Sequence, residues 1–99
     1  MQIGRVAGSV VSTAKEPSLE GRKLLLVHTL DADAKPTGDY VVAIDAVDAG
    51  VGDVVLVATG SSARLTEITR DKPSDAVIIA IVDSWDIHGE VKWRKSDET

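Results

Sequence analysis

The side chains best suited to metal binding lie in one short stretch of the sequence. His28 is followed by Asp31 and Asp33, and an imidazole with two carboxylates could share a divalent cation. The other histidine is far along the chain, and there is no cysteine to complete a usual ligand set. Asp31 and Asp33 also resemble the start of a calcium loop, but Gly38 comes late and Val42 stands where a bidentate glutamate is needed. We therefore expect no metal site.

Two small-residue stretches could serve as a nucleophile or a phosphate site. Ser61 and Ser62 lie outside any Gly-x-Ser-x-Gly pattern, so capping of a short helix explains their hydroxyls better. Gly60 opens the same stretch, but no lysine stands where a phosphate loop needs one. Gly50 and Gly52 precede a strand pattern rather than a helix, which does not fit a dinucleotide fingerprint. We expect no catalytic residue and no cofactor, and we expect that the chain is not an enzyme.

The stretch that most resembles a nucleic-acid surface is residues 92–95, Lys-Trp-Arg-Lys. Basic residues on an edge strand also prevent aggregation between sheets, which explains the cluster equally well. The chain carries a net charge of −5, so its field opposes polyanions and anionic membranes. Its aromatic residues are Tyr40, Trp85 and Trp93, too few for a face that stacks on bases. We expect no nucleic-acid partner and no membrane partner.

Length and composition predict one small intracellular domain. Ninety-nine residues make a single domain that buries about two thirds of its unfolded surface. The lack of cysteine fits a reducing cytosol. Met1 leads into residues 2–6 without a long apolar core, so we expect no secretory signal. No apolar run approaches the roughly twenty residues that span a bilayer.

Apolar segments alternate with turn signals along the chain, a spacing typical of an all-β domain. Gly4 and Gly8, inside the first strand, are expected at a bulge or a point of close packing. A turn-rich connection is expected at 31–39, a short helix at 61–69 and a hairpin turn at His88 and Gly89. Strands are expected at residues 3–12, 23–30, 40–45, 54–59 and 76–85, with a further edge strand at 91–94.

Several strand segments are apolar without the alternation expected of a sheet with one wet face. These segments are residues 24–27, 41–44, 54–58 and 77–82. Both of their faces need cover, and the chain has room for about one short helix, so a closed barrel covered by neighbouring subunits is the economical solution. A second apolar stripe contributes several kcal/mol at roughly 25 cal/mol per Å², enough to drive assembly. The alternative is a monomeric barrel in which these apolar segments are simply the hydrophobic core.

Seven segments, in order and spacing, carry a likeness to a known family. They are GSVVSTAK (8–15), LEGRKLLLV (19–27), AIDAV (43–47), AGVGD (49–53), GSSAR (60–64), DA (75–76) and AIVD (80–83). The likeness extends over nearly the whole chain, which resembles the pentamer-forming vertex proteins of bacterial microcompartment shells, the EutN/CcmL family.

The resemblance implies an all-β fold: a small closed OB-like five-stranded barrel with one short helix and an extra C-terminal edge strand, assembling as a ring. It implies a single vertex-protein domain at residues 1–95 with a polar tail at 96–99. The implied function is structural, because a tiling of hexamers closes into a polyhedron only when pentamers cap its five-fold vertices. The implied partners are further copies in a homopentamer and hexameric or trimeric shell proteins, in the bacterial cytoplasm.

By the same resemblance, two loops are expected at the subunit contacts and the five-fold axis. Arg64 could pair across the interface with Asp53 or Asp45, or it could be a solvated helix residue. Asp48 departs from the small residue that the family usually shows there, and we expect it to face solvent or to bond a neighbouring amide. The interface residues are Ala49, Gly50, Val51, Gly52 and Asp53 in the first loop and Gly60, Ser61, Ser62, Ala63 and Arg64 in the second.

Two rival interpretations remain open. One is an OB-type barrel that binds an oligonucleotide or a peptide, which would need a stacking face. The other is a small ligand-binding protein or enzyme with a site between subunits, for which the sequence offers no credible acid, base or nucleophile.

Overall fold

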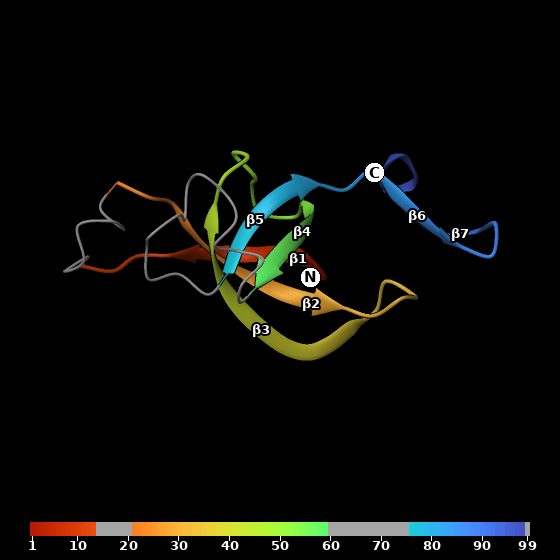
Figure 1. The fold of residues 1–99 in the computed structure, drawn as a ribbon, viewed down its shortest axis with the longest axis horizontal. Coiled ribbons are helices and arrows are strands. Elements are labelled where there is room, and N and C mark those ends of the chain that lie inside the picture. The colour runs from red at the N-terminus through yellow and green to blue at the C-terminus, as the bar shows by residue number, and fades with distance from the viewer. Residues whose placement is uncertain (14–20, 60–75, 99) are drawn as a thin grey trace.

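The fold is given by a computed structural model, which describes residues 1–13, 21–59 and 76–98. Strands make up almost all of its regular structure, as Figure 1 shows. The elements are β1 (Gln2–Val10), β2 (Leu24–Leu30), β3 (Pro36–Asp45), β4 (Val54–Thr59), β5 (Ala76–Ile81), β6 (Ser84–Ile87), β7 (Glu90–Arg94) and the 3₁₀ turn η4 (Lys95–Asp97).

Five of the strands close into a barrel in the order β1-β2-β3-β5-β4. Neighbouring strands are antiparallel except for β3 and β5, which run parallel and pair at Ile44 with Val77 and at Asp45 with Ile78. Closure removes the free edges that a five-stranded sheet would otherwise expose. The prediction of an all-β fold with a closed five-stranded barrel is confirmed, whereas the helix predicted at 61–69 lies outside the described residues.

Aliphatic side chains fill the barrel without any aromatic ring. Alternate residues of a strand point to opposite faces, and the inward set forms one continuous core. This core consists of Val6, Leu25, Val27, Ala43, Ala49, Val55, Val57, Ala76 and Ile78, each at most 3% exposed. At roughly 25 cal/mol per Å² its burial is the main stabilising term of the fold.

The opposite face of the sheet is buried at one end and open at the other. Ile44, Ala58 and Val77 form a second cluster next to the β3–β5 junction, each at most 2% exposed. Farther back along β3, Val42 is 47% and Tyr40 is 55% exposed. The single chain therefore covers both faces of its strands near the junction, whereas Val42 in β3 and Ile81, which is 36% exposed at the end of β5, are the exposed large residues of the predicted apolar runs.

Two glycines in β1 occupy the positions that the sequence analysis singled out. A Cβ atom at Gly4 would collide with the Val27 side chain and the His28 carbonyl oxygen, so this is a point of close packing between β1 and β2. The pairing register of β1 with β2 shifts between Val6 and Gly8, which places Gly8 at a bulge. Both roles agree with the prediction.

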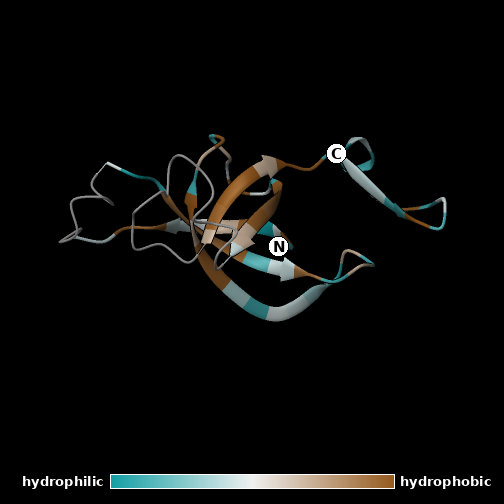
Figure 2. Ribbon diagram, in the orientation of Figure 1, coloured by the Kyte–Doolittle hydropathy of each residue, from teal (hydrophilic) through white to brown (hydrophobic). Residues whose placement is uncertain are grey.

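Two strand boundaries differ from the prediction by more than two residues. Strand β3 begins at Pro36, so residues 36–39 of the expected connection are strand and only residues 31–35 form the turn. Figure 2 shows why this half was missed: β3 is brown near β5 but pale to teal over its first half, without an apolar signal. The strand expected at 76–85 breaks at residues 82–83, where the chain leaves the barrel.

The predicted C-terminal edge strand is part of a separate two-stranded sheet. Strand β7 pairs with β6 through the predicted turn at His88 and Gly89, both with positive φ, and this hairpin stands apart from the barrel (Figure 1). Trp85 and Trp93 stack on each other at its base with ring centroids 5.4 Å apart. The Trp85 indole N–H donates to the Ala32 carbonyl at 2.8 Å, which fastens the hairpin to the 31–35 turn.

Candidate functional site

The first predicted interface loop follows β3 and is organised by one buried carboxylate. Asp45 Oδ1 accepts hydrogen bonds from the backbone N–H groups of Val47 at 3.0 Å and Ala49 at 3.2 Å. The Asp45 side chain is 2% exposed, and Lys23 Nζ lies 3.6 Å from its Oδ2 atom. Lys23 also donates to the Ala49 carbonyl at 2.7 Å. We call residues 45–53 the 45–53 turn, and these contacts fix its first half.

The second half of the 45–53 turn is closed by hydrogen bonds within the loop. The Gly50 N–H donates to Asp53 Oδ2 at 2.9 Å, and the Asp53 N–H donates to the Gly50 carbonyl at 3.0 Å. Gly52 has a φ of +95°, which glycine adopts without strain, and its N–H donates to the Val6 carbonyl of β1 at 2.9 Å. Val51 lies at the tip and is 71% exposed. An exposed aliphatic side chain on a rigid turn is suited to contact another protein surface.

The three small residues of this turn have different structural roles. Ala49 is fully buried in the barrel core, so it supports the turn from inside. At Gly50 an added Cβ would have its nearest neighbour, Asp53 Oδ2, at 4.0 Å, and φ lies outside the left-handed region. At Gly52 any side chain would be strained because of the positive φ. Gly50 is thus the position where a larger side chain changes the surface but not the fold.

Asp48 faces solvent, as predicted. Its side chain is 98% exposed, with Oδ1 at 3.7 Å from Lys23 Nζ. Its φ is +59°, in the left-handed region where glycine is favoured and aspartate is tolerated better than most other residues. This backbone conformation explains why a glycine fits the same position.

The second predicted loop, with Gly60, Ser61, Ser62, Ala63 and Arg64, lies outside the described residues. The two carboxylates considered as partners for Arg64 are both engaged inside the 45–53 turn. Asp45 accepts two backbone amides beside Lys23, and Asp53 accepts the Gly50 amide. The pairing of Arg64 remains a prediction.

Sequence reasoning missed two cationic residues that hold the 45–53 turn. Lys23 stands at the start of an apolar stretch, and its position in the sequence does not indicate that it binds the Ala49 carbonyl. Arg5 interrupts the otherwise uncharged β1, which was an available signal. Its Nη1 atom donates to the Gly52 carbonyl at 2.9 Å and to Glu98 Oε1 at 3.1 Å, and Nη2 donates to Glu98 Oε2 at 2.9 Å. This hydrogen bonding holds the pKa of the Glu98 carboxyl below its usual value.

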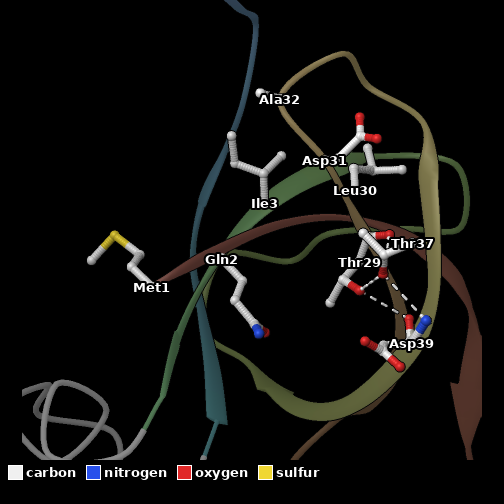
Figure 3. Close-up of a pocket in the computed structure, with 9 residues that line it drawn as sticks. All are labelled: Met1, Gln2, Ile3, Thr29, Leu30, Asp31, Ala32, Thr37 and Asp39. Carbon is white, nitrogen blue, oxygen red and sulfur yellow. Dashed lines mark hydrogen bonds between the residues drawn. The ribbon is translucent and has the colours of Figure 1, made fainter.

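A hollow opens at the end of the barrel, between the start of β1 and the β2–β3 turn (Figure 3). It measures about 440 Å³. The Thr29 and Thr37 hydroxyls bond to each other, and both also bond the main chain of Asp39. These polar groups already satisfy one another, so they are not organised around a ligand or a reacting atom.

The metal site that was considered in the sequence and not expected would have used His28, Asp31 and Asp33. His28 instead stacks on Tyr40 with ring centroids 4.2 Å apart, and the Asp31 side chain accepts two backbone amides of its own turn. Among the described residues there is no group of three or more His, Cys, Asp or Glu placed to hold a metal ion. The described part of the chain also contains no helix long and apolar enough to cross a membrane.

The family is decided by a match along most of the chain. The profile described as ethanolamine utilisation protein EutN/carboxysome, EutN_CcmL, matches residues 1–83. The chain belongs to the EutN/CcmL family. The match ends at Asp83, one residue before β6, so the hairpin and the residues after it lie outside the matched segment.

Individual EutN/CcmL proteins resemble the chain over nearly their full lengths. The carboxysome shell vertex protein CcmL of Synechocystis is 44% identical over 98 residues, which cover 99% of this chain and 98% of that protein. The solved structure of CcmL from Gloeobacter violaceus has a TM-score of 0.91 at 43% identity, covering 98% of this chain and all of that one. A pentameric microcompartment shell protein, GrpN from Rhodospirillum rubrum, has a TM-score of 0.80 at 42% identity, covering 88% and 99%.

Proposed function

We propose that this chain forms a ring of five copies that caps the vertices of a bacterial microcompartment shell. The observation that carries the proposal is the full-length similarity to shell vertex proteins, one of whose structural relatives is described as pentameric. A ring of identical subunits uses a heterologous interface, in which one surface meets a different surface of the next copy. The chain would then act through its shape, in the shell of an organelle in the bacterial cytoplasm.

The role follows from the geometry of closed shells. Hexameric tiles alone give flat sheets or tubes, because a closed polyhedron needs five-fold positions. The neighbours of the ring would be hexameric or trimeric shell proteins around its rim. The proposal assigns the chain no reaction, which agrees with the structural role of its named relatives.

The 45–53 turn is the described part of the proposed contact surface. Its backbone is fixed by Asp45, Lys23 and the link to β1, so little conformational entropy is lost when a neighbour binds. Val51 offers exposed apolar area at its tip. The proposal keeps residues 49–53 and 60–64 as the two interface loops near the axis.

The aromatic residues do not favour the rival oligonucleotide-binding barrel. Trp93 is 8% exposed and stacks on Trp85, so neither indole offers two free faces to a base. Tyr40, which is 55% exposed, stacks on His28. A single-stranded DNA probe that bound in a salt-dependent manner would support that rival instead.

The function is tested in the organism that makes the protein. Deletion of its gene should leave shells that are elongated or unclosed in electron micrographs, because the five-fold positions lack their cap. Expression of the intact chain in the deletion strain should restore closed polyhedra. Closed shells in the deletion strain would contradict the proposal.

Gly50→Leu tests the position of the contact surface. The leucine Cβ would have its nearest neighbour, Asp53 Oδ2, at ordinary contact distance, so we expect far-ultraviolet circular dichroism to be unchanged. If the 45–53 turn meets the next copy, ring dissociation followed by native mass spectrometry on dilution should shift by tenfold or more, about 1.4 kcal/mol.

Glu90→Leu on the hairpin is the matched control, because it adds the same side chain at a position that is 76% exposed. It should leave the ring unchanged. Equal stability of the Gly50→Leu ring and the unsubstituted ring would remove the 45–53 turn from the interface.

A further inference from the structure

Arg5 joins three parts of the molecule that are far apart in the sequence. Its guanidinium donates to the Gly52 carbonyl in the 45–53 turn and, through both terminal nitrogens, to the Glu98 carboxylate. Its Cζ atom lies 6.0 Å from the centroid of the Trp93 ring. One side chain of β1 therefore contacts the turn, the base of the hairpin and the segment after η4.

The geometry of this contact is more specific than that of an ordinary surface ion pair. Exposed pairs contribute little to stability, and the Arg5 and Glu98 side chains are 34% and 46% exposed. A two-pronged pair, however, fixes the plane of the guanidinium, and the Trp93 ring lies within cation–π range of it. Because the two hydrogen bonds to Glu98 fix the guanidinium, the hydrogen bond from Arg5 to the Gly52 carbonyl has a fixed direction. Arg5 is thus oriented by the C-terminal segment while it binds the turn.

Residues 84–98 follow the part that the family profile matches, which ends at Asp83. This C-terminal segment is fastened at two places. Trp85 donates to the Ala32 carbonyl and Lys92 lies 3.7 Å from Asp33 at the 31–35 turn, while Glu98 pairs with Arg5 at the 45–53 turn. A two-stranded hairpin alone is marginally stable in water, so these anchors determine its position.

The C-terminal segment also forms part of the surroundings of Val51. A hollow of about 410 Å³ is lined by Val51, Gly52 and Asp53 of the turn, by Trp93, Lys95 and Glu98 of the C-terminal segment, and by Arg5. The exposed tip of the 45–53 turn and the C-terminal segment therefore share one surface. A change in the position of the segment would alter the surface that the turn presents.

We propose that Arg5 is a positioning residue that couples residues 84–98 to the 45–53 turn. Through Arg5, Glu98 helps to set the position in which the turn meets the next copy in the ring. This inference rests on the proposed function, because it assumes that the turn meets a neighbouring subunit. It adds that the last residues of the chain control how firmly the ring closes.

The coupling depends on the charge of Glu98. The charged groups that face it across the hollow are Arg5, Lys95 and Asp53. Arg5 lowers the pKa of Glu98 below its ordinary value, so the ionised carboxylate is the form that the folded chain favours. The stabilisation is fully present above that ordinary value and is lost as the pH falls through the lowered one.

Glu98→Gln tests the coupling without disturbing the barrel, because the side chain is at the surface and keeps its size. Ring dissociation on dilution, measured by native mass spectrometry at pH 7, should be about two- to fivefold easier at each interface. Arg5→Lys, which keeps the charge but not the fork, should have a similar effect. Glu90→Gln is the control, since its carboxylate, 76% exposed, pairs with Lys92 far from the turn.

A pH series separates positioning from a general loss of stability. The difference between the unsubstituted ring and the Glu98→Gln ring should be largest at neutral pH and should vanish in acid, where Glu98 is protonated in both folded and unfolded chains. Rings of equal stability at pH 7 in Glu98→Gln, Arg5→Lys and the unsubstituted protein would overturn the coupling and leave the vertex function standing. An unsubstituted protein that forms no pentamer would overturn both.

Discussion

The turns that begin at Asp31 and Asp45 have the same construction. In each, Oδ1 of the leading aspartate accepts hydrogen bonds from the backbone N–H groups two and four residues later, and the residue three positions on has a positive φ. The members are Asp31, Asp33, Ala34 and Lys35 in the first turn and Asp45, Val47, Asp48 and Ala49 in the second.

The two turns differ in burial and in their contacts. The Asp45 side chain is 2% exposed beside Lys23, and its turn leads into the buried Ala49. The Asp31 turn is exposed, and the β6–β7 hairpin packs on it through Ala32 and Asp33. The same local motif therefore sets the path of the chain twice, once around a buried carboxylate beside Lys23 and once around an exposed one.

Removal of the leading aspartates should give the largest contrast between the turns. Asp45→Ala leaves two backbone amides without their acceptor at a buried position and removes the carboxylate beside Lys23, so we expect a loss of about 3 kcal/mol in unfolding free energy. Asp31→Ala frees amides that water can reach, and we expect a loss of about 1 kcal/mol. Urea unfolding at one fixed protein concentration measures both. Equal losses would show that burial does not distinguish the turns.

Ala34→Gly should stabilise the exposed turn. Ala34 has a φ of +65°, a conformation that costs an alanine about 1 kcal/mol and a glycine almost nothing. Part of that gain is offset by the greater freedom of glycine in the unfolded chain, so we expect an increase of about 0.5 kcal/mol. Thermal unfolding followed by circular dichroism is the measurement, and a lower melting temperature would argue against a strained Ala34.

Asp48→Gly should change stability least. Glycine relieves the φ of +59°, but the contact between Asp48 and Lys23 at 3.7 Å is lost. Aspartate tolerates this conformation and an exposed ion pair contributes little, so the two effects nearly cancel, within about 0.5 kcal/mol. Urea unfolding beside Ala34→Gly tests this, and a gain larger than that of Ala34→Gly would mean that Asp48 is the more strained residue.

The sequence predicts the strands where an apolar run and a turn signal coincide. Residues 54–59 were predicted with the bounds of β4, because the apolar run starts directly after a glycine turn. The first half of β3 was missed because its side chains are exposed and carry no hydrophobic pattern. The break before β6 was missed because an apolar segment continues to the end of β5 and Trp85 extends it in the sequence, although Trp85 packs on Trp93 in another sheet.

The candidate site was predictable only in part. Small residues identified the 45–53 turn as a place where backbone comes to the surface, and the resemblance gave it a role. The contacts that hold it come from Lys23, Arg5 and Glu98, which lie far from it along the chain. No spacing rule connects such residues, because tertiary folding alone brings them together.

The central claim is tested most directly by the native mass of the purified protein at micromolar concentration. The account predicts a dominant species of five times the mass of one chain, which persists on moderate dilution. A compact, stable single chain or a dimer under the same conditions would contradict it.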